Sequence, residues 1–396
     1  MADLKNTIQG LADKYFEEII SIRRHLHRHP ELSFKEVETS AFICSRLEEW
    51  GIDYRKDIVK TGIVAEIQGS GSGRTIAFRA DMDALPITEK SGLEYTSENE
   101  GVMHACGHDV HTSSLLGMIR ILSDLRDSFR GKILFVFQPG EERIPGGAKL
   151  MLEEKVFGEE EPELIIAQHV FPDLPAGTVG FREGIYMASS DEIFINVKGK
   201  GGHAALPDIL VDPVLIAAHI IVTLQQIVSR NNKPGLPTVL SFGKIDAPGS
   251  VNVIPDGVRI EGTFRTMDEE WRQAVHQKIK AISSMIAESM GGEAEVEIRG
   301  GYPLLVNNPV LTRKLKSYAI EFIGEENVKE LDIRMTAEDF AYFAQKYPAS
   351  LFRLGSSTPG MAGSGLHTST FYVDESAIKT SIGLMAWMAL NLTDSI

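Results

Sequence analysis

The chain has 396 residues, 43% of them hydrophobic and 24% charged, which is the composition of a globular protein with room for two or three domains. Its 55 acidic residues outnumber 40 basic ones, and the formal net charge is -15. Binding to nucleic acid or to an anionic membrane begins with attraction by a basic patch, so this balance argues against both partners.

The first 190 residues alternate between helical and strand patterns. Residues 1–50 have the apolar spacing of two helices, with Pro30 as the stop between them. Short strands that are apolar on both faces follow, with a helical stretch between the first and the second. Such strands are typical of a central sheet covered by helices. The expected strands are 75–78, 133–137 and 164–167, and the helix is 112–125.

From about residue 191 the strands become half-exposed. Val258, Ile260 and Phe264 alternate with polar residues, as in an antiparallel sheet with one solvated face. The predicted order is β-α-β-β-α-β, which is that of a ferredoxin-like sandwich. Its elements are strand 191–198, helix 212–229, strands 237–245 and 257–266, helix 268–289 and strand 293–299.

The mixed pattern of helices and buried strands resumes after residue 300. A helix over 310–323, a strand over 350–354 and a helix from Glu375 are expected. The fold class is therefore α/β, with a large mixed-sheet domain interrupted by a small ferredoxin-like α+β domain. We place the first part of the large domain at 1–186, the inserted domain at 187–299 and the second part at 300–396.

Cysteine usage and apolar runs favour a cytoplasmic location. Two cysteines, Cys44 and Cys106, are too few for a secreted disulfide scaffold. The first six residues lack the basic start and apolar stretch of a signal peptide. The longest apolar run, Val214–Leu224, is too short to span a bilayer and contains His219.

Two segments rich in metal-binding groups follow the first apolar strand. Asp81 and Asp83 close that strand, although a solvated turn would have the same pattern. Cys106 and His108 offer a thiolate and an imidazole, both ligands of first-row metals. Gly107 between them would let both side chains face one point. A histidine near a helix start also caps or packs, so this segment alone leaves both interpretations open.

The later strands end in similar groups. Glu141 and Glu142 follow the most apolar strand, and their mutual repulsion calls for a stabilising partner unless the loop is simply exposed. His169 ends the next strand, where an isolated histidine is more often structural. His367 lies in a Gly/Ser-rich loop near the C-terminus. In open α/β sheets, sites form at the carboxyl ends of strands, so these groups are expected to gather there.

Several motifs in one order resemble the M20 metallopeptidase and amidohydrolase family, in its aminoacylase, hippurate hydrolase and auxin-conjugate hydrolase branch. The similarity spans nearly the whole chain. The segments that carry it are 23–32, Arg79–Pro86, Gly101–Asp109, Gln138–Glu142, Gly199–Ala205, Asn252–Asp256, Ala337–Phe340 and Leu366–His367.

The resemblance implies a dinuclear metal centre in the large domain. The five implied metal ligands are Cys106, His108, Glu142, His169 and His367. Glu141 matches the family's catalytic base, and Asp83 matches a carboxylate that supports the metal centre. Many other branches have a histidine ligand at the position of Asp81. This chain instead has the Cys-x-His arrangement of the N-acyl-amino-acid branch.

The inserted domain matches the family's lid and dimerisation domain, and its His203 matches a catalytic histidine that often reaches the partner subunit's active site. A homodimer through this domain is therefore expected. His203 would stabilise the oxyanion of the attacked amide. Asn252 is a weaker candidate for substrate contact. Arg265 would pair with a substrate carboxylate or lie on the domain surface, and the sequence leaves both open.

The implied function is metal-dependent hydrolysis of small N-acyl amino acids to a carboxylic acid and a free amino acid. Two divalent ions, Zn, Mn, Co or Ni, would lie about 3.5–4 Å apart and share a water, with Glu141 accepting its proton. A dipeptidase or exopeptidase is the alternative within the family.

Two rivals lie outside it. A hydrolase with Cys106 as nucleophile leaves Glu141 and Glu142 without a role. A non-catalytic binding protein would not need the complete ligand set. His25 and His29, four apart on a helix, resemble a metal-binding pair, but no Glu follows His25 and Pro30 ends the helix at once, so we expect them to be structural.

Overall fold

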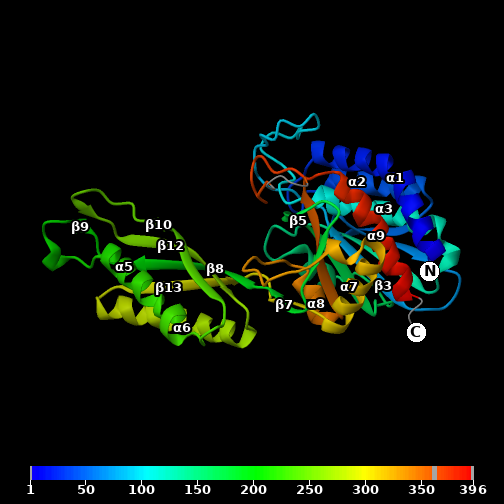
Figure 1. Cartoon of the computed structure of the whole chain (residues 1–396). Helices are drawn as coiled ribbons and strands as arrows, with labels where there is room; N and C mark the ends of the chain where they lie inside the picture. The colour runs from blue at the N-terminus through cyan, green and yellow to red at the C-terminus, as the bar shows by residue number, and fades with distance from the viewer. Residues whose placement is uncertain (1, 359–363, 394–396) are drawn as a thin grey trace. The chain divides into compact units, whose positions relative to one another are not determined.

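The computed structural model describes residues 2–358 and 364–393 and divides into two compact units (Figure 1). Unit 1 consists of Met1–Tyr186, Val306–Asp332 and Asp339–Ile396, and unit 2 of Met187–Leu305 and Ile333–Glu338. Unit 2 thus continues past the boundary expected at residue 299 and includes a later segment. Gly301 N donates to Ser190 O at 3.0 Å and Ala188 N to Arg334 O at 3.0 Å, so both segments are hydrogen-bonded within unit 2.

Unit 1 is built on an eight-stranded mixed sheet. Its strand order is β1-β2-β4-β3-β5-β16-β6-β15. The four central strands, β4, β3, β5 and β16, run parallel to one another, whereas β1 with β2, β2 with β4, and β16 with β6 are antiparallel pairs. The bounds are β1 Asp53–Ile58, β2 Gly62–Gln68, β3 Thr75–Asp81, β4 Lys132–Gln138, β5 Leu164–Pro175, β6 Val179–Phe181, β15 Val328–Glu330 and β16 Ala349–Ser357.

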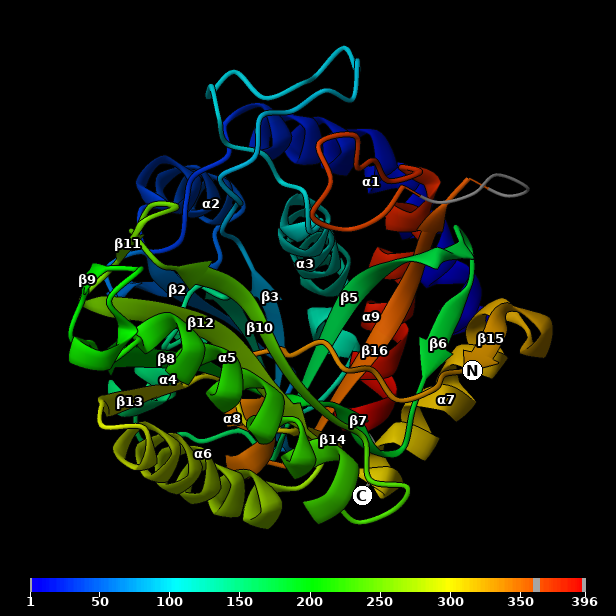
Figure 2. The ribbon, with the colours of Figure 1, turned by 90° about the vertical axis from the view of Figure 1, so that its left-hand side faces the viewer.

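Helices cover both faces of this sheet. α1 (Ala2–Arg28), α3 (His108–Asp124) and α9 (Ser376–Thr393) pack on one another, and α3 and α9 also contact the central strands (Figure 2). α7 (Pro309–Ile323) packs on α9, and α2 (Val37–Glu49) on β1 and β2. Phe78 faces the α1/α3/α9 core, whereas the next residue, Arg79, points to the opposite face, where it lies over Phe340 beside α8. α4 (Gly147–Glu153) and α8 (Ala341–Lys346) pack together there.

Sequence signals account for the ends of several helices. α1 ends at Arg28, two residues before Pro30, and α3 begins directly after Gly107. α7 begins with Pro309, and the side chain of Asn308 accepts the Leu311 N–H at 3.0 Å as an N-cap. Short 3₁₀ turns complete unit 1 at Arg126–Ser128 (η1) and Glu325–Asn327 (η4).

Unit 2 contains the predicted β-α-β-β-α-β order. The elements are β8 (Ser189–Lys198), α5 (Pro213–Leu224), β10 (Thr238–Asp246), β12 (Gly257–Thr266), α6 (Glu269–Ser289) and β13 (Glu293–Gly300). The sheet order β10-β12-β8-β13, antiparallel throughout, is that of a ferredoxin-like sandwich. Ile193 and Ile195 of β8, Ile260 of β12, Ile216 of α5 and Val275 of α6 share its core.

Smaller elements join these. β9 (Gly202–His203) pairs with β11 (Val253–Ile254), and β7 (Gly184–Met187) pairs with β14 (Leu305–Asn307). η2 spans Pro207–Ile209. A π-helical turn, η3 (Ile227–Asn231), follows α5, and together they form a helical segment over Pro213–Asn231.

The segment Pro213–Asn231 is long and apolar enough to cross a membrane by length and composition, although we expected the run Val214–Leu224 to be too short. The π-helical turn accounts for the extra length. One such helix is weak evidence of a membrane span, because helices of a protein core have the same composition. A third of its most apolar stretch is buried inside unit 2.

Candidate metal centre

The site residues of unit 1 lie level with the carboxyl ends of β3 and β4. His169 was expected to end its own strand, but β5 continues past it to Pro175. β4, β3 and β5 are neighbours, and Asp81 is the last residue of β3. Ala167 of β5 pairs with Arg79 of β3, so His169, two residues further along, lies level with Asp81. The turn with Glu141 and Glu142 follows the end of β4. The carboxyl-end rule for α/β sheets therefore brings these three segments together.

A glycine turn places the thiol and the first imidazole. Gly107 has φ +83°, a conformation that L side chains rarely adopt, and a Cβ there would lie 2.5 Å from Cγ2 of Val170. The turn lets α3 start at His108 while Cys106 remains just outside the helix. Both side chains are buried.

The thiol of Cys106 lies between two imidazoles from distant parts of the chain. Its Sγ is 3.4 Å from Nε2 of His169 and 3.3 Å from Nε2 of His367. Oε1 of Glu142 is 3.1 Å from the same His367 nitrogen and 3.9 Å from Nε2 of His108. The fold thus gathers all five side chains for which the sequence implied a metal-binding role.

In His108 and His169, a hydrogen bond at Nδ1 leaves Nε2 as the nitrogen that faces the other candidate ligands. Nδ1 of His108 donates to the backbone oxygen of Asp83 at 2.8 Å, and Nδ1 of His169 donates to the oxygen of Val170 at 2.8 Å. A neutral ring that donates from Nδ1 has its lone pair on Nε2. In the neutral form that binds a metal, each Nε2 atom therefore has the lone pair that a ligand needs, with the second hydrogen bond typical of ligating histidines.

Two buried atoms at this point lack a hydrogen-bond partner, namely Nε2 of His108 and Oε1 of Glu142. Oε1 of Glu142 is close to His367 but no donor is aligned with it. Groups of three donors within 4.8 Å of one another include Cys106–His108–His169 and Cys106–Glu142–His367. A bound cation would satisfy both orphan atoms, so the donor set fits a divalent transition metal.

Electrostatics favour the same conclusion. Burial, followed by the charges of Glu142 and Glu141, raises the pKa of Cys106 well above its usual value. Burial holds the pKa of His169 well below its ordinary value, so this ring is neutral. Burial would also lower the pKa of His108, but Asp81 and Asp83 outweigh it and raise the pKa to about 10. The site is therefore rich in negative groups, and a cation would convert the thiol to a ligating thiolate.

Asp83 holds the turn that carries the two glutamates. Its carboxylate oxygens accept the backbone N–H of Glu141 and of Glu142, each at 3.0 Å, and the hydroxyl of Ser33 at 2.6 Å. Burial would raise the pKa of Asp83, but the hydrogen bond from His108 and these donors lower it. Asp83 is thus an ionised, fully engaged carboxylate beneath the turn.

His111 is a neighbour of the site but not a candidate ligand. Its Nδ1 donates to Oδ1 of Asp81 at 2.6 Å, and its Nε2 accepts the backbone N–H of Val170 at 2.9 Å. Both nitrogens are occupied, so the geometric cluster of Asp81, His108 and His111 is not a further ion site. The ring instead ties the end of β3 to β5 beside His169.

A buried arginine network, for which the sequence assigned no role, supports the strand ends. The side chain of Arg79 donates to Asp81 at 2.7 Å, to Gln138 at 2.8 Å and to Asp339 at 2.8 Å. Arg79 is 2% exposed. The sequence could have indicated this network, because an arginine at the end of an otherwise apolar strand is expected to be buried and a buried guanidinium requires acidic partners.

His367 enters the site from a C-terminal loop. Its φ is +58°, uncommon for a residue with a side chain, and its N–H donates to Ala105 O at 2.8 Å. The side chain is half-exposed. Strained backbone is typical of functional positions, where the surrounding contacts enforce it.

The three remaining predicted residues lie in unit 2. His203 is exposed on β9, and its Nδ1 accepts the N–H of Ala205 at 3.1 Å. Asn252 is exposed beside it, since its backbone oxygen accepts the Ala204 N–H at 3.0 Å. Arg265 is half-buried on β12, where Nη1 donates to Met335 O at 3.1 Å. The fold brings His203 and Asn252 together within this unit.

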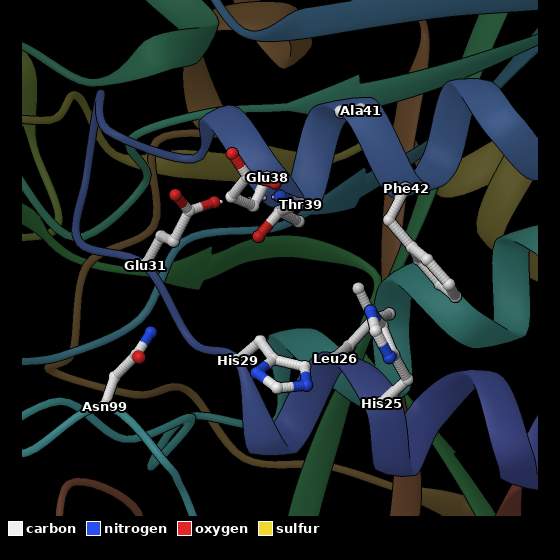
Figure 3. A pocket seen from close by; sticks show the side chains of 9 residues that line it. All are labelled: His25, Leu26, His29, Glu31, Glu38, Thr39, Ala41, Phe42 and Asn99. Atoms are coloured by element: carbon white, nitrogen blue, oxygen red, sulfur yellow. Dashed lines mark hydrogen bonds between the residues drawn. The ribbon is translucent and has the colours of Figure 1, made fainter.

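A separate cavity of about 450 Å³ in unit 1 has His25 and His29 in its wall (Figure 3). His25 stacks on Phe42 at a centroid distance of 4.0 Å. Within the described residues, neither histidine belongs to a group of three metal-binding side chains. A structural role remains the expectation for this pair.

Comparisons with known proteins agree with the motifs. The model of peptidase family M20/M25/M40 matches residues 77–391. The N-acetyl-L-cysteine deacetylase of Bacillus subtilis (strain 168) is 41% identical over 379 residues, covering 96% of this chain and 89% of that protein. The N-acetyldiaminopimelate deacetylase of Geobacillus thermodenitrificans (strain NG80-2) is 39% identical over 368 residues, covering 92% of this chain and 95% of that protein.

A solved structure is similar along the whole chain. It is a Bacillus subtilis protein described as a dinuclear metal binding peptidase from the M20 family, with a TM-score of 0.82 and 35% identity. The match covers 97% of this chain and 100% of that one.

Proposed function

Because this chain belongs to peptidase family M20/M25/M40, as its motifs predicted, we propose that it is a metal-dependent amidohydrolase of N-acyl amino acids. It cleaves the amide to a carboxylic acid and a free amino acid. The observation that carries the proposal is the position of the Cys106 thiol, within 3.4 Å of one imidazole and 3.3 Å of another. Relatives named as deacetylases of N-acetylcysteine and N-acetyldiaminopimelate support this substrate class.

Two divalent ions, Zn, Mn, Co or Ni, are the proposed cofactors, and their ligands are Cys106, His108, Glu142, His169 and His367. When bound, such ions polarise the amide carbonyl and lower the pKa of a coordinated water toward neutrality. The description of the solved relative as a dinuclear metal binding protein supports the number of ions.

Glu141 is the proposed general base. Its carboxylate is 7% exposed, and Oε2 lies 4.0 Å from Nε2 of His108, beside the proposed ligands. The hydrogen bond from its N–H to Asp83 fixes the backbone from which it projects. A positioned carboxylate can take a proton from the attacking water and return it to the leaving amine, a role that typically contributes about 10²–10⁴-fold in rate.

His203 is the proposed oxyanion donor. The Ala205 N–H occupies its Nδ1, so the neutral ring has its proton on Nε2 and can donate from there. Loss of one such donor typically costs about 10²–10³-fold in kcat. His203→Ala should therefore lower kcat by this order, and an unchanged kcat would remove His203 from the mechanism.

Asn252 and Arg265 are proposed substrate contacts. Asn252 has an exposed amide beside His203. Burial lowers the pKa of Arg265, and one of its terminal nitrogens donates to Met335 O, so the rest of the guanidinium remains for a carboxylate. Replacement of either should raise KM more than it lowers kcat, and unchanged KM values would exclude both.

We propose that the protein works in the cytoplasm as a homodimer through unit 2. The thiol ligand Cys106 needs a reducing compartment, and both cysteines are free. On α5, Val214, Leu215 and Val222 are 40%, 50% and 73% exposed. Their spacing of seven and eight residues places them on one face of the helix, which a second copy would cover.

Reconstitution tests the function. Purified protein is stripped with chelator, loaded with Zn, Mn, Co or Ni in turn, and assayed for amine release from N-acetyl amino acids, N-benzoyl amino acids and dipeptides. Hydrolysis of the N-acyl compounds is expected, and a preference for dipeptides would favour the peptidase alternative. Glu141→Gln should keep its metal content but lose at least about 10²-fold in kcat, while the exposed control Glu100→Gln stays at the wild-type rate. Activity without metal, or full activity of Glu141→Gln, would contradict the proposal.

A further inference from the structure

The segment between α1 and α2 contacts both loops that carry the site. The backbone oxygen of Glu31 accepts the Ala84 N–H at 2.8 Å, and the hydroxyl of Ser33 donates to Asp83 at 2.6 Å. A third link comes from Glu36, at the start of α2. Residues 31–36 therefore connect two helices to the catalytic loops, although the sequence motifs assigned them no role.

The side chain of Glu36 is fully buried and accepts three hydrogen bonds. Oε1 accepts the backbone N–H of Phe34 and of Gly140, each at 2.8 Å. Oε2 accepts the hydroxyl of Thr61 at 2.9 Å. A buried carboxylate with matched donors is costly to form and strongly fixes the groups around it.

Glu36 occupies the N-cap position of α2, yet its side chain does not cap that helix. The N–H of Thr39, which an N-cap side chain would ordinarily accept, is bound at 2.8 Å by Oε2 of Glu31 (Figure 3). Glu31 therefore caps α2 by accepting the Thr39 N–H, and Glu36 instead accepts the Gly140 N–H.

Gly140 is the residue before Glu141 and Glu142. Its φ is +63°, and a Cβ at this position would lie 2.4 Å from the ring of Phe34, so the turn packs directly against the 31–36 segment. The hydrogen bond from Gly140 N–H to Glu36 fixes one side of the turn, and the two N–H groups that Asp83 accepts fix the other.

We propose that Glu36 is a positioning residue that holds the turn so that Glu141 and Glu142 face the metal centre. It contacts neither ligand nor substrate and acts through Gly140. The inference rests on the proposed function for the roles of Glu141 and Glu142. A displacement of a catalytic group by about 1 Å can cost about 10²-fold in rate, so the position of this turn matters for chemistry.

Glutamine can replace Glu36 without loss of these contacts. Its carbonyl oxygen would still accept the N–H groups of Phe34 and Gly140. Its amide would donate to Thr61, whose hydroxyl can accept as readily as it donates. Alanine removes both acceptor oxygens and with them all three hydrogen bonds, and aspartate keeps the charge but is one methylene too short to reach Gly140.

The experiment compares Glu36→Ala, Glu36→Gln and the control Glu31→Ala in the metal-loaded enzyme. Metal affinity is measured by competition with a chromophoric chelator, and kcat and KM on an N-acyl amino acid. Glu36→Ala should lose about 10–100-fold in metal affinity and in kcat with little change in KM. Glu36→Gln should return both quantities to within about threefold of wild type. Glu31→Ala should lose stability alone, because its side chain caps α2 without touching the turn.

Wild-type metal affinity and kcat in Glu36→Ala would overturn the inference, as would equal losses in Glu31→Ala or no rescue by glutamine. If Glu36→Ala does not fold, Glu36→Asp takes its place and should show the same loss of metal affinity; affinity at the wild-type level would refute the proposal. A wild-type enzyme that hydrolyses no N-acyl amino acid would refute the proposed function, while the chelator competition would still decide the role of Glu36.

Discussion

Glu36→Gln should stabilise unit 1 in a pH-dependent way while it leaves the turn in place. The wild-type carboxyl is 0% exposed. Burial, reinforced by the charge of Asp83, raises its pKa to about 7 from 4.5. The glutamine isostere keeps the hydrogen bonds but never ionises, so it avoids the cost of a buried charge.

The size of the gain follows from the two pKa values. Below pH 4.5 the carboxyl is protonated in both the folded and the unfolded chain, and ionisation costs nothing. Between pH 4.5 and 7 the unfolded chain ionises first, so the wild-type protein loses stability as the pH rises through this window. One pKa unit corresponds to about 1.4 kcal/mol, so the gap between 4.5 and 7 amounts to about 3 kcal/mol at pH 8 and about 1 kcal/mol at pH 5.

Differential scanning calorimetry of chelator-treated protein at pH 5 and pH 8 measures this difference. Glu36→Gln should raise Tm by roughly 3–6 °C at pH 8 and by roughly 1–2 °C at pH 5. Glu154→Gln is the matched control, because Glu154 also accepts a backbone N–H, that of Val59 at 2.8 Å, but is exposed to water. Its Tm should follow that of the wild type at both pH values. An equal gain for Glu36→Gln at both pH values, or none at pH 8, would refute the reasoning.

Three further substitutions test the scaffold and the dimer. Arg79→Met leaves the buried carboxylates of Asp81 and Asp339 without their cation and should lower the free energy of unfolding by about 3–5 kcal/mol. Thermal unfolding measures this loss, and a Tm within about 2 °C of wild type would contradict it. Gly107→Ala places a side chain on a residue with a φ of +83° and against Val170 of β5. Chelator competition should show at least about tenfold weaker metal binding, and unchanged affinity would contradict the role of the Gly107 turn in placing the ligands. Val222→Glu, with a charge on the exposed face of α5, should sediment as a monomer, whereas an unchanged mass would move the interface elsewhere.

The convergence of the site was predictable because it depends on strand order and local motifs. Apolar strands ending in Asp81 and before Glu141 are parallel neighbours, and parallel strands present their carboxyl ends at one edge. Gly107, between two ligand-type residues, indicated a turn there, and its φ is +83°. The inserted sandwich was predictable for a similar reason, since alternating residues such as Val258 and Ile260 fix one buried face.

Other features depend on contacts between distant residues that no local pattern carries. Asp339, which pairs with Arg79, is 260 positions away in the sequence. Strand β1 was missed because Asp53–Ile58 is polar and mostly exposed at the sheet edge, where pairing rather than apolar periodicity defines it. Unit 2 extends to Leu305, six residues past the boundary expected at 299, since the Leu304 N–H bonds to Glu269 at 2.7 Å and keeps the following turn in this unit.

The ionisable side chains around the site fall into two groups. In one group the protein itself balances the charge, and in the other it does not. Asp81 has the guanidinium of Arg79 at 2.7 Å, and Asp83 has three protein donors, so their charges are balanced within the fold. Oε1 of Glu142 has no aligned donor, and burial together with nearby carboxylates keeps Cys106 a neutral thiol in the metal-free chain. Because buried polar atoms are rarely left unpaired, Oε1 of Glu142 points to a partner from outside the chain. A cation suits this position, because it would pair with the carboxylate and convert the neighbouring Cys106 thiol to a ligating thiolate.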